Sequence, residues 1–94
     1  MSVETILQEV EQREKEVTAV RKLWSVTVGV HVPSVAQVST WLALHNFDAV
    51  VEGVRIAGKK LQLMDGDMTA DHLVRFTSSV MNFRKASRAE KAAA

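Results

Sequence analysis

The chain has 94 residues, of which 47% are hydrophobic and 24% charged, and its net charge is +1 at pH 7. This length suits one domain with a single core, and the apolar fraction excludes a chain that is disordered throughout. The absence of cysteine excludes disulfides and thiolate metal sites, and the small net charge excludes a strongly basic nucleic-acid binder.

Charge is distributed unevenly along the chain. Residues 1–20 hold five glutamates against Arg13 and Lys15, whereas residues 84–91 hold four basic residues against Glu90. Opposite charges at the two ends predict either attraction between subunits or contact of the basic end with phosphate. No apolar run approaches the roughly 20 residues that span a bilayer, and the acidic N-terminus is unlike a secretory signal. We therefore expect a cytoplasmic protein without a membrane partner.

Residues 3–24 are predicted to form one long amphipathic helix, capped by Ser2. Its apolar residues recur at steps of three and four, a heptad pattern that its own domain or another copy must cover. We therefore predict a homo-oligomer, with coverage by the domain itself as the alternative. The candidate oligomer interface consists of Val3, Ile6, Val10, Val17, Val20 and Trp24.

Residues 25–33 place valine at every second position, a pattern typical of a β-strand. Gly29 weakens this pattern, Pro33 ends it, and residues 61–64 are the only other short candidate for a partner strand. We expect an extended connector that lays some of these valines against the helices. A small two-stranded ribbon is the alternative.

Three shorter helices are expected to follow. The second begins after Ser34, which forms a capping box with Gln37, and ends near His45. The third is capped by Asn46 or Asp48 and ends at Gly58 or one turn later; its buried stripe is Phe47, Val50, Val51, Val54 and Ala57. The last begins near Thr69, and its core face is Leu73, Phe76, Val80 and Phe83. The prediction is one all-α domain over residues 1–94, a small bundle of four main helices with a core over residues 33–86 and a tail over residues 87–94.

No pattern of catalytic residues is present. His31, His45 and His72 lack the spacing of metal ligands, and no nucleophile elbow or phosphate-cradling glycine loop occurs. The acidic residues after Asp65 indicate a turn rather than a calcium loop, because the sixth and twelfth positions hold Ala70 and Phe76. We expect no enzyme, no metal site and no cofactor.

The helices over residues 34–58 are joined by a tight turn, so a helix-turn-helix is one interpretation of them. The second helix offers only Arg55 as a base reader and carries two acidic residues, which favours an ordinary helical hairpin. Trp24 and Trp41 both lie on apolar faces, which favours core packing over stacking on bases.

The strongest functional candidate is a set of basic residues in the second half of the chain. Two of them lie four residues apart on one helix, and others follow the final helix, where they can neutralise phosphates without reading sequence. The alternative is a solvated charged face. The candidate DNA-binding residues are Arg55, Lys59, Lys60, Arg75, Arg84, Lys85 and Arg88.

Residues 33–84 resemble the DnaD-like domain of bacterial and phage replication proteins. The likeness consists of Pro33-Ser34 leading to Trp41-Leu42, an apolar stripe over Phe47 to Lys60, and Phe76-x-x-x-Val80-Met81. The chain departs from that family where Phe76 replaces a frequent tyrosine and Arg84 a tryptophan. The long charged N-terminal helix is also absent from the usual module.

The resemblance implies a helical domain that binds DNA, self-associates and helps to deliver a replicative helicase, with Phe76, Val80 and Met81 supporting the last helix. We therefore expect a non-enzymatic DNA-replication accessory domain with DNA and a replication protein as partners. The alternative is a helical oligomerisation or adaptor domain that binds protein partners only.

Overall fold

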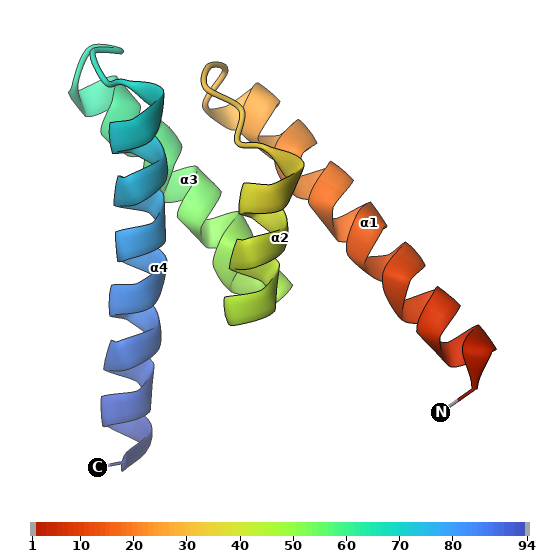
Figure 1. The fold of residues 1–94 in the computed structure, drawn as a ribbon. Helices are drawn as coiled ribbons and strands as arrows, with labels where there is room; N and C mark the ends of the chain where they lie inside the picture. The colour runs from red at the N-terminus through yellow and green to blue at the C-terminus, as the bar shows by residue number, and fades with distance from the viewer. Residues whose placement is uncertain (1, 94) are drawn as a thin grey trace.

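Four helices make up most of the chain. The computed structural model describes residues 2–93, with side chains up to Lys91. The helices are α1 (Val3–Thr27), α2 (Val35–Leu44), α3 (Phe47–Leu63) and α4 (Ala70–Ala93), and the described residues contain no strand. The predicted all-α bundle of four helices is confirmed (Figure 1).

The first helix continues past the predicted end at Trp24. At its start, the Ser2 hydroxyl accepts a hydrogen bond from the Thr5 amide at 3.2 Å. At its end, Gly29 adopts a φ of +84°, a left-handed conformation that glycine reaches without steric cost. The amides of Val28 and Gly29 both donate to the Trp24 carbonyl, which satisfies the last turn. Gly29 therefore sets the length of α1.

The alternating valines behave only in part as predicted. Val26 lies on α1 with its side chain exposed, and Val30 and Val32 are exposed in the connector. Val28 alone among the four packs against the core. Helix propagation adds a hydrogen bond with each residue, whereas a strand here has no partner, so the helix extends through Thr27. The extended connector is consequently shorter than predicted, and Val30 and Val32 within it keep 45% and 39% of their surface exposed.

The two central helices begin where their caps predict. The Ser34 hydroxyl accepts from the Gln37 amide at 3.1 Å, and the Asn46 side chain accepts from the Ala49 amide at 2.8 Å. α3 does not stop at Gly58 but runs to Leu63, the longer of the two predicted ends. Gly58 is buried inside the helix, so it serves packing rather than termination.

The last helix buries a narrower face than predicted. Leu73, Thr77 and Met81 are buried, and Phe76 and Val80 are half-buried. Phe83, predicted in the core, is 72% exposed. At about 100° per residue, Phe83 points about 120° away from the buried Thr77, so it turns out of the helix interface. The remainder of α4 stays helical to Ala93.

The core is centred on α3, which packs against both α1 and α4, while α2 lies against α1 and α3. Trp24 and Trp41 stack with ring centroids 6.1 Å apart. Their indole N–H groups donate to the Val30 carbonyl and to the Ser78 hydroxyl, each at 2.7 Å, so neither buried ring leaves a polar atom unpaired. Core packing, the interpretation favoured for both tryptophans, is what the structure shows.

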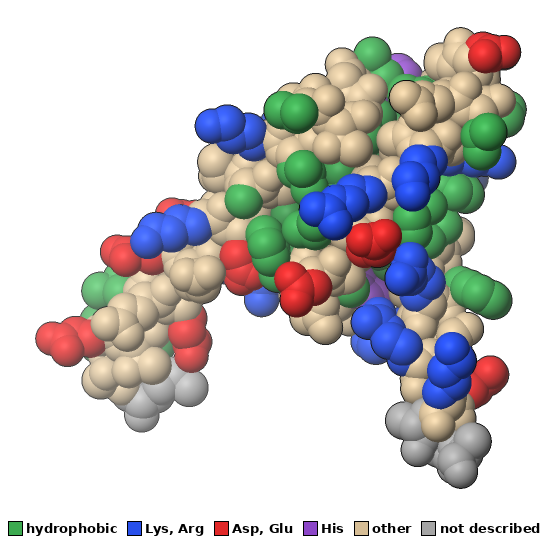
Figure 2. All heavy atoms as spheres, turned by 180° about the vertical axis from the view of Figure 1, so that it is seen from behind, with side chains coloured by type: hydrophobic (Ala, Val, Ile, Leu, Met, Phe, Trp, Pro, Cys, Tyr) green, Lys and Arg blue, Asp and Glu red, His purple; other side chains and the backbone are tan. Residues whose placement is uncertain are grey.

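The molecule is a flat fork, 49 × 37 × 18 Å in extent. α1 and α4 diverge toward the end at which both termini lie, and the shorter α2 stops before that end (Figure 1). We call residues 2–15 of the chain the N-terminal arm and residues 84–91 the C-terminal arm. Every residue of the N-terminal arm is exposed. Acidic side chains gather on the first arm and basic ones on the second (Figure 2).

Candidate nucleic-acid interface

The third helix supplies the first two basic side chains of the candidate interface. Its buried side consists of apolar and glycine residues, which turns Arg55 and Lys59 to solvent one helical turn apart. The Arg55 guanidinium lies 3.6 Å from the Glu52 carboxylate, an exposed pair that contributes little to stability. Both cations therefore remain accessible to a phosphate.

The fourth helix supplies two more. Arg84 lies seven positions after the buried Thr77, and Arg88 lies seven positions after the buried Met81. Both arginines therefore lie on the core-facing side of α4. There α4 passes the beginning of α3, and the two arginines line a shallow depression together with Asp48 and Glu52. The core-facing side of α4 thus changes from apolar to basic where α4 passes the N-terminal end of α3.

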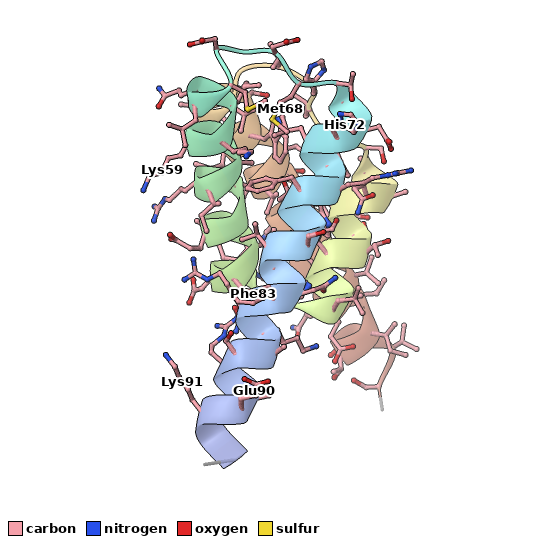
Figure 3. The ribbon with its side chains drawn as sticks, turned by 90° about the vertical axis from the view of Figure 1, so that its left-hand side faces the viewer. Lys59, Met68, His72, Phe83, Glu90 and Lys91 are labelled. Atoms are coloured by element: carbon pink, nitrogen blue, oxygen red, sulfur yellow. The ribbon has the colours of Figure 1, made fainter. Side chains whose placement is uncertain are left out.

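These side chains from two helices form one surface. Glu52 lines both the depression beside Arg84 and the neighbouring one beside Arg55 and Lys59, which joins the two groups. Lys and Arg side chains follow one another over α3 and down α4 in Figure 2. Lys59 and Lys91 point to the same side of the molecule in Figure 3. We define the basic face as Arg55, Lys59, Arg84, Arg88 and Lys91.

Three of the predicted DNA-binding residues do not join the basic face. Lys60 is half-buried, with its Nζ 5.4 Å from the centre of the Phe76 ring, a cation–π contact within the domain. Arg75 lies on the side of α4 opposite the core, 3.1 Å from Asp71. Lys85 donates to the Leu44 carbonyl at 2.9 Å, on the side of α4 that faces α2. Lys91, which was not predicted, belongs to the basic face instead. Its spacing of seven residues from Arg84 is the sequence signal that identifies it.

A second depression lies where α4 passes the turn between α2 and α3. We call it the hollow, and its lining residues are Ala43, Leu44, His45, Asn46, Ala49, Lys85 and Arg88. His45 is buried, and its Nδ1 has no hydrogen-bond partner. Burial lowers the pKa of His45, the charges of Lys85 and Arg88 lower it further, and a hydrogen bond with Asn82 opposes them. The histidine is therefore held neutral, and the positive charge of the hollow comes from Lys85 and Arg88.

The predicted oligomer interface is divided by the fold. Val17, Val20 and Trp24 belong to the chain's own core, so they are not available to another copy. Val3, Ile6 and Val10 are exposed on the N-terminal arm. Leu7, which the prediction omitted, is exposed beside them, and its place one turn after Val3 identifies it.

Within residues 2–93, no three histidine, aspartate or glutamate side chains gather closely enough to hold a metal ion. None of the helices in that range combines the length and the hydropathy of a bilayer-spanning segment. The turn at Asp65-Gly66 has two left-handed residues and leads into α4, where the Thr69 hydroxyl accepts from the His72 amide at 3.2 Å.

Compared with models of protein families, with curated proteins and with solved structures, the chain matches none of them. The resemblance to DnaD-like domains therefore stays a prediction. Of its three supporting residues, Met81 is buried, while Phe76 and Val80 are half-buried on the same helix.

Proposed function

We propose that the chain is a non-enzymatic domain that binds the phosphate backbone of nucleic acid through the basic face. The observation that carries the proposal is the convergence of exposed cations from two helices on one side of the molecule. Four of them line two adjacent depressions that contain only two carboxylates, those of Asp48 and Glu52. The side is therefore positive although the whole chain is close to neutral.

The form of the surface favours binding without sequence preference. Arg55 and Lys59 lie about 6 Å apart along the axis of α3, as do Arg84 and Arg88 along α4, so the cations form two short rows. Rows of cations meet the regularly spaced phosphates and release counterions, a mechanism that does not depend on base identity. A role in DNA replication follows only from the resemblance to DnaD-like domains.

The proposal is tested by fluorescence anisotropy with labelled single- and double-stranded DNA. The variant Arg84→Gln with Arg88→Gln removes two cations from the basic face, and we expect its affinity to fall about tenfold or more at low salt. The matched control is Arg75→Gln with Lys15→Gln, which removes two exposed cations from other surfaces. Equal losses in both variants would show that only net charge matters and would overturn the assignment.

A second candidate function is that of a helical adaptor that binds proteins and no nucleic acid. The exposed apolar residues of the N-terminal arm favour it, because clustered apolar side chains on a surface mark an interaction site. The two functions differ in the effect of Ile6→Ser with Val10→Ser. An adaptor loses its partner when these exposed apolar side chains are lost, whereas a nucleic-acid binder keeps its ligand.

A further inference from the structure

The N-terminal arm carries an apolar stripe that nothing in its own chain covers. Val3, Ile6, Leu7 and Val10 are 72%, 46%, 55% and 49% exposed. Their spacing places them on one side of α1, in line with the buried Val17 further along the helix. A helical segment of this length is marginal by itself in water and gains its stability from packing. The stripe is therefore a surface that fits a partner.

The charge of the arm restricts what that partner is. The arm holds Glu4, Glu9, Glu11 and Glu14 against Arg13 and Lys15, so it is acidic. Two such arms packed against each other would bring like charges together, which opposes a contact between the two stripes themselves. A suitable site is apolar at its centre and basic at its edge.

The hollow on the other side of the fork has this composition. Ala43, Leu44 and Ala49 give it apolar walls, and Lys85 and Arg88 give it positive charge. Leu44 is 53% exposed at this place. The hydrogen bond from Lys85 to the Leu44 carbonyl holds the ammonium group beside the apolar residues. The hollow thus complements the arm in charge and offers its apolar stripe a contact at Leu44.

We propose that the N-terminal arm docks in the hollow of a second copy of the chain. The apolar stripe faces Leu44 of that copy, and the glutamates of the arm face its Lys85 and Arg88. The arm does not reach the hollow of its own chain, since every residue of the arm is exposed and α1 diverges from α4 (Figure 1). Because both features lie at the same end of the fork, a two-fold axis pairs each arm with a hollow, and the assembly closes as a dimer.

This inference is independent of nucleic-acid binding, and sedimentation equilibrium of the full chain without nucleic acid tests it. We expect a dimer that dissociates on dilution. Ile6→Ser with Val10→Ser destroys the stripe, and Leu44→Glu places a negative charge in the hollow. Each change should lower the association constant by at least about tenfold. Val26→Ser, which removes an exposed valine from the other end of α1, is the control and should leave it unchanged.

Mixing the two variants decides which surfaces meet. A chain without its stripe and a chain without its hollow still hold one intact arm and one intact hollow between them, so the mixture should associate more strongly than either variant alone. If Leu44→Glu alone remains fully dimeric, the hollow is not where the arm docks and the proposal is wrong. A wild-type chain that stays monomeric up to about 1 mM also overturns it. Circular dichroism of each variant verifies that the bundle is folded.

Discussion

His45 is the residue whose ionisation is most closely coupled to the fold. It ends α2, and the burial of its ring and the charges of Lys85 and Arg88 disfavour its charged form. Because the folded-state pKa is lowered from the ordinary value of 6.5, the unfolded chain takes up this proton at a higher pH than the folded chain. Stability is therefore complete above that value and falls as the pH decreases below it.

Thermal unfolding at a series of pH values tests this coupling. Between about pH 7.5 and about pH 5.5, we expect the free energy of unfolding of the wild type to fall, by at most about 1.4 kcal/mol per pH unit for one proton. His45→Gln should flatten this dependence, whereas His72→Gln, at an exposed position, should retain it. An unchanged pH dependence in His45→Gln would show that other groups cause it.

At the residue scale, the sequence identified the basic residues but not the surface of the bundle to which each side chain points. Arg84 and Arg88 were found from charge, and they lie on the basic face. Lys60 and Arg75 have the same composition signal, but one packs over Phe76 and the other lies opposite the core. Which side of a helix reaches a shared surface depends on how the helices pack, and local spacing does not specify that packing.

The helices meet closely at two glycines of α3. A Cβ atom at Gly53 would lie 2.9 Å from the Met81 Cγ, and one at Gly58 would lie 3.0 Å from the Thr27 carbonyl oxygen. The first contact brings α3 against α4, and the second brings it against the end of α1. These glycines allow α3 to lie at the centre of the bundle, and they thereby bring the two rows of the basic face together.

Substitution of Gly53 tests this close approach. Alanine is intrinsically better than glycine in a helix by about 1 kcal/mol, so Gly53→Ala should stabilise α3 unless the Met81 contact opposes it. Overpacking costs about 1–3 kcal/mol, so after the gain from alanine we expect a net loss of up to about 2 kcal/mol, measured by urea unfolding. Combining it with Met81→Ala, which alone leaves a cavity, should cost less than the sum of the two changes. Additive losses would mean that these positions do not share one space.

The starts of the helices were more predictable than their ends. Ser34 was predicted as a cap, and Asn46 was one of two predicted caps with Asp48, because a short polar side chain accepts from an amide only a few residues away. Residues 25–33 were expected to form an extended connector, with a two-stranded ribbon as the alternative, because alternating valines suit extended backbone, but a strand forms only with a partner. In its absence, α1 extended until Gly29 took its left-handed conformation.

At the scale of the whole molecule, one half of the heptad pattern of α1 is buried in the core and the other half is exposed. Val17, Val20 and Trp24 lie in the core, while Val3, Ile6 and Val10 extend beyond the body of the bundle. The sequence pattern is the same in both halves, so only the length of the neighbouring helices decides which half is covered. The hollow was equally unpredictable, because its walls come from three helices that are distant in the sequence.

The fork shape also relates the two proposed surfaces. Arg88 lines both the hollow and the depression beside Asp48, so it belongs to the basic face and to the docking site of the second copy. The arm variant Ile6→Ser with Val10→Ser leaves all cations of the basic face in place. This variant should weaken self-association, but it leaves unchanged the charges that bind nucleic acid. It therefore separates self-association from nucleic-acid binding.

The central claim is that cations of α3 and α4 bind phosphates together, and the salt dependence of DNA binding tests it most directly. Measured by anisotropy over a series of salt concentrations, the logarithm of the association constant should fall against the logarithm of salt concentration with a slope of about −0.9 for each phosphate contacted. We expect a steep slope for the wild type, made shallower by about 2 in Arg84→Gln with Arg88→Gln and unchanged in Arg75→Gln. An absence of binding at low salt, or a slope that these arginines do not affect, would contradict it.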